Sequence, residues 1–74
     1  MENLDHILLF KTNISHESEK KLLEIILDNN PNIQNWSIDM DDIDCVLRIE
    51  SFTLSHNEII ELINRHGYKC RELI

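Results

Sequence analysis

The sequence has few of the features that mark large functional classes, and each absence excludes one of them. It contains a single glycine, Gly67, so it lacks the glycine-rich loop that many proteins use to hold a phosphate. Its longest strongly apolar run, residues 7–10, is far shorter than the roughly 20 residues that a membrane-spanning helix needs. Its first ten residues include acids but no Lys or Arg, whereas a secretory signal needs a basic start. We therefore expect a cytoplasmic protein with no membrane-spanning segment.

The chain is also poor in basic and aromatic residues. Fourteen Asp and Glu stand against seven Lys and Arg, which gives a net charge of −7 that repels a phosphate backbone. RNA-recognition domains place aromatic side chains on their central strands within a basic surface, but here Phe10 is nearly alone. We therefore expect no nucleic-acid partner.

The two cysteines, Cys45 and Cys70, form no C-x-x-C motif, so neither zinc-ribbon spacing nor a redox pair is present. Cys45 alternates with Leu47 and Ile49, which predicts a small buried hydrophobe. We expect Cys70, two residues after Tyr68, to be more exposed, but no neighbouring base or second thiol is there to activate it. No nucleophile with an adjacent base and no paired carboxylates are recognisable, so we do not expect an enzyme.

Seventy-four residues are enough for one small domain, residues 1–74, because a chain of this length buries only about 60% of the surface that its unfolded form exposes. Hydrophobic periodicity predicts six elements. They are a strand over 6–12, a helix from about 15 to 28, strands over 34–40 and 45–50, a helix from 56 to 66 and a strand over 68–74. This βαββαβ order predicts an α+β, ferredoxin-like sandwich with two helices on one face of a four-stranded antiparallel sheet.

Both predicted helices carry recognisable start signals. In the first, Ser15 is placed to cap the helix, and Glu17 and Glu19 suit the positive end of the helix dipole. In the second, Ser55 and Glu58 have the S-x-x-E spacing of a capping box, so we expect the helix to begin directly after Ser55. Leu54 and Ile59 stand at the two positions of a hydrophobic staple, and Gly67 is placed to close this helix in a left-handed conformation.

Three segments together resemble the heavy-metal-associated domain of copper chaperones and metal-pumping ATPases. They are the helix leucines Leu23 and Leu27, the stretch PNIQNWSIDMD, and the stretch ELINRHGYKC with its Gly-Tyr pair. The resemblance covers nearly the whole chain and implies the same βαββαβ fold.

The family's metal loop reads Met-x-Cys-x-x-Cys, and here both cysteines are replaced. Counting back without gaps places Ile14 at the Met, His16 at the first Cys and Glu19 at the second. Cu(I) prefers sulfur donors, so the resemblance implies that the scaffold is kept while transfer of Cu(I) is lost. The loop-equivalent residues, including the Tyr that the family places beside the metal, are Ile14, Ser15, His16, Glu19 and Tyr68.

Two functions remain open. The first is a non-catalytic module with a degenerate metal site that acts through protein contacts, either with a partner protein or as a homodimer through a sheet edge. The alternative is a metal-binding or metal-trafficking protein in which His16 and Glu19, together with His66, hold a borderline ion such as Zn(II) or Ni(II). The alternative has a Zn, Ni or Cu ion as its cofactor, and the first interpretation has none.

Overall fold

In the computed structural model, which describes residues 6–74, the elements follow one another in the predicted βαββαβ order. They are β1 (Ile7–Thr12), α1 (Glu17–Asp28), β2 (Asn35–Asp39), β3 (Val46–Glu50), α2 (His56–Arg65) and β4 (Cys70–Glu72). Neither helix in this part of the chain has the length and hydropathy that a bilayer crossing requires.

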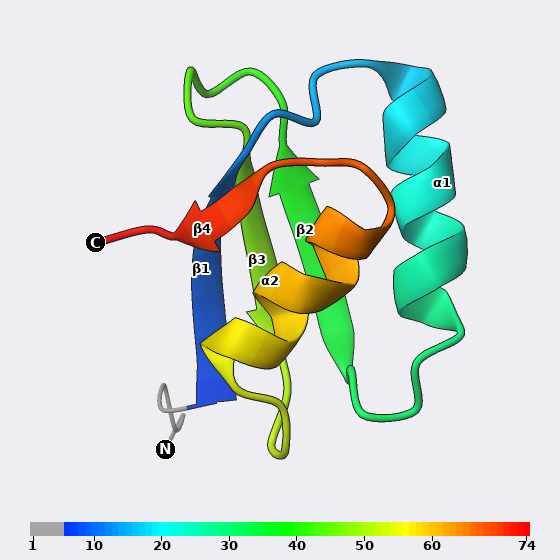
Figure 1. Cartoon of the computed structure of the whole chain (residues 1–74), viewed down its shortest axis with the longest axis vertical. Helices are drawn as coiled ribbons and strands as arrows, with labels where there is room; N and C mark the ends of the chain where they lie inside the picture. The colour runs from blue at the N-terminus through cyan, green and yellow to red at the C-terminus, as the bar shows by residue number, and fades with distance from the viewer. Residues whose placement is uncertain (1–5) are drawn as a thin grey trace.

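The four strands form one antiparallel sheet in the order β2-β3-β1-β4 (Figure 1). β3 and β1 are the central strands, and Leu8 of β1 faces Ile49 of β3 in their register. β2 and β3 form a hairpin, in which Trp36 also faces Ile49. β2 and β4 are therefore the two edges, and the predicted α+β, ferredoxin-like fold is confirmed.

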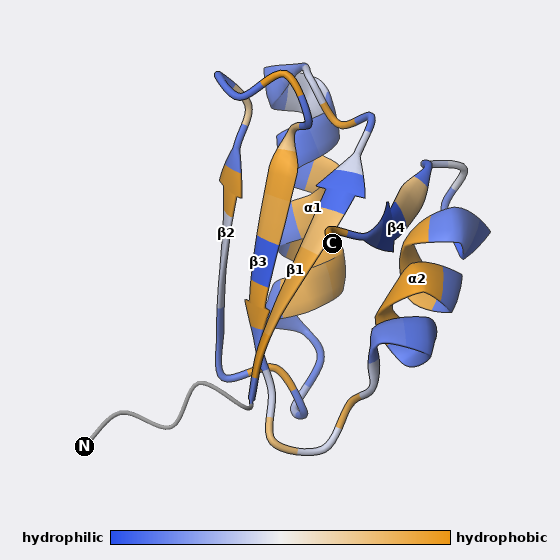
Figure 2. Cartoon of the chain, turned by 90° about the vertical axis from the view of Figure 1, so that its left-hand side faces the viewer, coloured by the Kyte–Doolittle hydropathy of each residue, from blue (hydrophilic) through white to orange (hydrophobic). Residues whose placement is uncertain are grey.

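One hydrophobic core joins the two helices to one face of the sheet. α1 contributes Leu23 and Leu27, and α2 contributes Ile59 and Ile63. On the sheet, alternate residues point into this core, which produces the buried and half-buried alternation of β1 and β3. Figure 2 shows the strands with α1 behind them. The core residues of the sheet are Leu8, Phe10, Leu47, Ile49 and Cys70.

The start of α2 agrees with its sequence signals in most respects. Ser55 is the N-cap, and its Oγ accepts a hydrogen bond from the amide of Glu58 at 3.3 Å. The reciprocal bond differs from a capping box, because the Ser55 hydroxyl donates to the Glu58 carboxylate at 3.3 Å. Leu54 and Ile59 both belong to the core or pack against it, as the predicted staple requires.

The end of α2 is closed as predicted by Gly67, whose φ of 92° is the left-handed conformation. The Gly67 amide donates to the carbonyl of Asn64 at 3.0 Å, and the Tyr68 amide donates to the carbonyl of Ile63 at 3.3 Å. This pair of bonds is a Schellman motif, which leads the chain directly into β4.

Candidate functional site

The loop after β1, where the sequence resemblance predicts a degenerate metal loop, is held by hydrogen bonds to two other segments. Ile14 is completely buried, as expected of an apolar plug. The Thr12 hydroxyl donates to the carbonyl of Cys45 at 2.7 Å and accepts from the amide of Ile14 at 3.2 Å. The Asn13 amide donates to the carbonyl of Lys69, and the Lys69 amide donates to Asn13 Oδ1 at 2.9 Å. The loop is thus joined to the segments before β3 and before β4.

The start of α1 corrects the expectation that Ser15 is the cap. The N-cap is His16, in extended backbone conformation, and Glu17 is the first helical residue. Glu19 Oε1 accepts hydrogen bonds from the amides of Ser15 and His16, both at 3.1 Å. Glu19, the third helical residue, thus accepts from the N-cap amide as the corresponding residue of a capping box does. Glu19 therefore acts here as a structural group.

The three candidate metal ligands lie at two helix ends, His16 and Glu19 at the start of α1 and His66 at the end of α2. His16 is the exposed N-cap of α1, whereas His66 is the exposed C-cap of α2. Within residues 6–74 no three or more His, Cys, Asp or Glu side chains form a group that could hold a metal ion. Tyr68 is half-buried and packs against the core. The structure does not bring His16, Glu19 and His66 together as a ready site, so metal binding by this set stays a prediction.

The two cysteines lie on opposite sides of β1. Thr12 faces Cys70 in the β1–β4 register, and its hydroxyl contacts Cys45 on the β3 side. Two strand spacings amount to roughly 10 Å, which exceeds the reach of a disulfide, and both thiols are free. Cys45 is buried as predicted. Cys70, expected to be more exposed, is also buried, and burial raises the pKa of its thiol to about 11.

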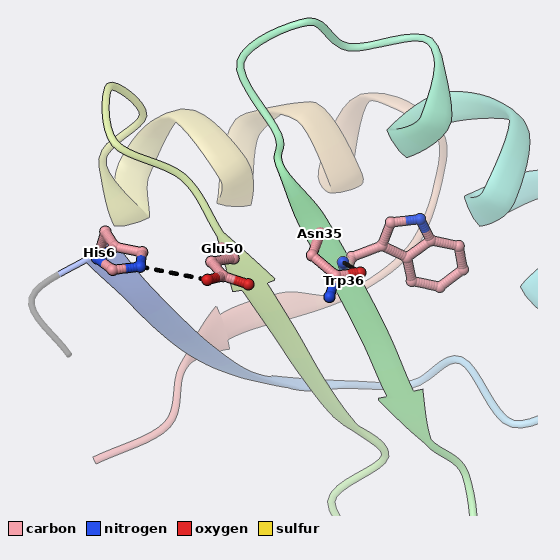
Figure 3. A network of polar contacts seen from close by, with 4 residues as sticks. All are labelled: His6, Asn35, Trp36 and Glu50. Atoms are coloured by element: carbon pink, nitrogen blue, oxygen red, sulfur yellow. Dashed lines mark hydrogen bonds and ion pairs between the residues drawn. The ribbon is translucent and has the colours of Figure 1, made fainter. Parts of the chain in front are cut away.

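His6, for which the sequence offers no partner, contacts β3 at the other end of β1. Its Nε2 lies 3.2 Å from Glu50 Oε1 (Figure 3), and its ring stacks on Phe52 with 4.4 Å between centroids. The contact joins the start of β1 to the end of β3 and to the loop that follows. The partners are more than forty positions away in the sequence, so no local pattern indicates them.

The backbone of the edge strand β2 presents hydrogen-bonding groups away from the sheet. The Ser51 amide donates to the carbonyl of His6 and so points toward the β1 side. Because amide directions alternate along a strand, the amides of Glu50 and Arg48 point toward β2. The β2 residues that pair with Glu50 and Arg48 direct their amides toward β3. The amides of Trp36 and Ile38, which alternate with them, therefore point away from the sheet.

One of these two outward amides is already occupied. The Trp36 amide donates to Asn35 Oδ1 at 2.9 Å (Figure 3). The open donor of the β2 edge is therefore the amide of Ile38, and the outward carbonyls of both residues are acceptors.

β2 leads into a turn that concentrates negative charge, residues 39–44, which we call the acidic turn. Asp39 accepts from the amide of Asp41 at 3.1 Å, and Asp42 accepts from the amide of Asp44 at 2.8 Å. These bonds, in which an Asp side chain accepts from an amide two residues later, fix the turn. Ile43 at its tip is 95% exposed.

Basic side chains gather at the opposite edge of the sheet, where the sequence indicated no site. A hollow of about 470 Å³ lies beside β4 and the end of α2. The residues that line it are Lys11, Thr12, Asn13, Asn64, Lys69, Cys70 and Arg71. Lys69 and Arg71 are two positions apart in the sequence, but only the β1–β4 register places Lys11 opposite Arg71.

Comparison of the chain with protein-family models, with curated proteins and with solved structures gives no match.

Proposed function

We propose that the protein is a non-catalytic interaction module that binds an extended, basic segment of another protein along the edge of β2. The outward amide of Ile38 and the outward carbonyls of Trp36 and Ile38 support this proposal, because an added strand uses such groups. β2 has five residues, whereas the other edge, β4, has three. The β2 edge therefore offers the longer template for strand addition.

The acidic turn determines the chemistry of the partner. It follows β2 directly, so a strand that pairs with β2 has one end beside Asp41 and Asp42. Of the acids in this turn, Asp44 is paired with Lys11 at 3.2 Å. Exposed carboxylates within a Debye length of about 10 Å attract Lys and Arg of an incoming segment and speed its association.

A partner of different sequence fits this edge better than a second copy. Each copy carries a net charge of −7, so self-association is opposed by charge. The predicted homodimer through a sheet edge is therefore the alternative to a different partner, and a binding experiment must distinguish the two.

The proposal includes a degenerate metal site. His16 and Glu19 stand where the resembled family has thiolates, and Glu19 already accepts from two amides at the start of α1. The loop at this position is thus proposed to serve the scaffold and not to pass on Cu(I).

The experiment is a titration of ¹⁵N-labelled protein with a short peptide of alternating lysine and valine. Strand addition shifts the amide signals around Trp36 and Ile38, and the affinity falls as salt is added. A peptide of alternating glutamate and valine is the matched control and should not bind. Shifts confined to other elements, or equal binding of both peptides, would contradict the proposal, and sedimentation equilibrium of the free protein reports a homodimer.

A pair of charge variants tests the acidic turn separately. Asp41→Asn with Asp42→Asn removes two charges but keeps the side-chain oxygen with which Asp42 accepts from Asp44. Glu24→Gln with Glu61→Gln removes two charges from exposed positions of the helices. The first pair should weaken peptide binding several-fold and the second should leave it nearly unchanged, because steering depends on proximity. Equal losses would mean that only the net charge matters.

A further inference from the structure

The hollow beside β4 contains two like charges in directly opposed positions. Lys11 lies directly opposite Arg71 in the antiparallel β1–β4 register, and like charges in directly opposed positions repel each other. Lys69, two residues before Arg71, lines the same hollow. Three of the seven Lys and Arg of a chain with twice as many acids thus line one hollow.

The positive charge of the hollow is mostly uncompensated. Lys11 pairs with Asp44 at 3.2 Å, and in residues 6–74 neither Lys69 nor Arg71 forms a salt bridge. The hollow also contains a positioned neutral donor. Because Asn13 Oδ1 accepts from the Lys69 amide at 2.9 Å, the two hydrogens of the Asn13 amide nitrogen remain to donate to a ligand.

Compensation of the α2 dipole does not account for this cluster. Cations near a helix C-terminus interact with about half a negative charge, and Arg65 already lies in the last turn of α2. The final carbonyls of the helix accept from His66, Gly67 and Tyr68. Two further cations, Lys69 directly before β4 and Arg71 within it, exceed what the helix end requires.

We propose that this hollow binds a compact oxyanion, the phosphate or carboxylate group of a small ligand. Lys69 and Arg71 supply charge, Arg71 with the fork geometry that suits both groups, and Asn13 donates a hydrogen bond. The bound anion removes the repulsion between Lys11 and Arg71. The volume of about 470 Å³ lies within the usual range of ligand pockets. The site lies at the β4 edge, away from β2, so it is independent of the proposed peptide interaction.

The test is a titration of ¹⁵N-labelled protein with inorganic phosphate and, separately, with acetate, each at constant ionic strength set by sodium chloride. The proposal expects saturable shifts of the amides of Asn13, Lys69 and Arg71. Shifts with both anions assign a general oxyanion site, and shifts with phosphate alone assign a phosphate site. If neither anion shifts these amides, or if chloride shifts them equally, the site does not exist.

Two matched double variants localise the binding. Lys69→Ala with Arg71→Ala should weaken the affinity for phosphate by about tenfold or more, because it removes two charge-assisted contacts. Lys20→Ala with Lys21→Ala makes the same change of net charge on α1 and should change the affinity less than about twofold, because its charges lie outside the hollow. Equal losses in the two double variants would overturn the assignment.

A single substitution separates binding from stability. Arg71→Glu turns the repulsive pair with Lys11 into an attractive one, so this variant should unfold at a higher urea concentration than the natural protein while losing phosphate binding. A variant that keeps its phosphate affinity would exclude Arg71 from the site and overturn the proposal.

Discussion

The indole nitrogen of Trp36 donates a hydrogen bond to Asp28 Oδ1 at 2.8 Å, which joins the edge strand β2 to the last residue of α1. The indole ring also packs against the core, so Trp36 attaches β2 both to α1 and to the core. An edge strand held in this way is a preformed template, and a partner strand loses less entropy when it pairs with it.

The bond between Trp36 and Asp28 should contribute measurably to stability. Trp36→Phe keeps an aromatic ring and removes the donor, and it should lower the free energy of unfolding by about 1 kcal/mol, a typical value for one hydrogen bond. Amide exchange in β2 should become faster at the same time, because the strand loses its contact with α1. Urea unfolding and hydrogen exchange measure the two effects. Unchanged exchange in β2 would show that the bond does not hold the edge.

The two serines that precede the helices should differ sharply in their contribution to the free energy of unfolding. Ser55→Ala should cost about 1 kcal/mol, because the Ser55 hydroxyl accepts from the amide of Glu58. Ser15→Ala should stay within about 0.5 kcal/mol of the natural protein, because Ser15 uses only its amide, which donates to Glu19. Urea midpoints at unchanged slope give both values. A large loss for Ser15→Ala would restore Ser15 as the cap of α1.

The buried thiol of Cys70 should make stability fall at alkaline pH. Burial raises the pKa of Cys70 from 9.0 to about 11 in the folded protein. Between these values the unfolded chain loses the proton and the folded chain keeps it, so rising pH favours unfolding, on the order of 1 kcal/mol per pH unit. Urea midpoints at about pH 8 and pH 10 measure the loss. Cys70→Ala is the control and should show a smaller decline, whereas an identical decline would exclude Cys70 as its source.

Restoring thiolates should create a Cu(I) site if the gap-free placement of the loop is right. His16→Cys with Glu19→Cys should gain strong Cu(I) affinity, because soft thiolates replace an imidazole and a carboxylate. The same protein should lose about 1 kcal/mol of stability, because Glu19 no longer accepts from the two amides at the start of α1.

Competition with a Cu(I) chelator under reducing conditions measures this gain, with Cys45→Ser and Cys70→Ser in both backgrounds. No gain would show that His16 and Glu19 do not occupy the ligand positions. Two results would favour the metal-trafficking alternative. One is strong competition for Cu(I) by the protein that keeps His16 and Glu19, and the other is a saturable Zn(II) titration of the natural protein with shifts at His16 and His66.

The fold was predictable because its signals are local. Ser55 and Gly67 mark the limits of α2 within a few residues of sequence, and the alternation of Trp36 with Ile38 marks β2. The cap of α1 was misplaced by one residue because two polar residues, Ser15 and His16, precede the helix, and the structure has His16 as the N-cap.

The sites were less predictable because they depend on pairing across strands. The burial of Cys70 and the opposition of Lys11 and Arg71 follow from the β1–β4 register, which no short pattern encodes. The outward direction of the Ile38 amide likewise depends on which side of β3 faces β1.

The most direct test of strand addition removes the outward donor of the β2 edge, the amide of Ile38. Chemical synthesis of the chain with an N-methyl group on the Ile38 amide leaves every side chain and the β2–β3 ladder in place, because this amide points away from β3. In a titration with the lysine–valine peptide, we predict that the methylated protein binds about tenfold or more weakly than the natural one, which corresponds to ~1.4 kcal/mol for a lost hydrogen bond. Equal affinity of the two proteins would contradict binding along β2.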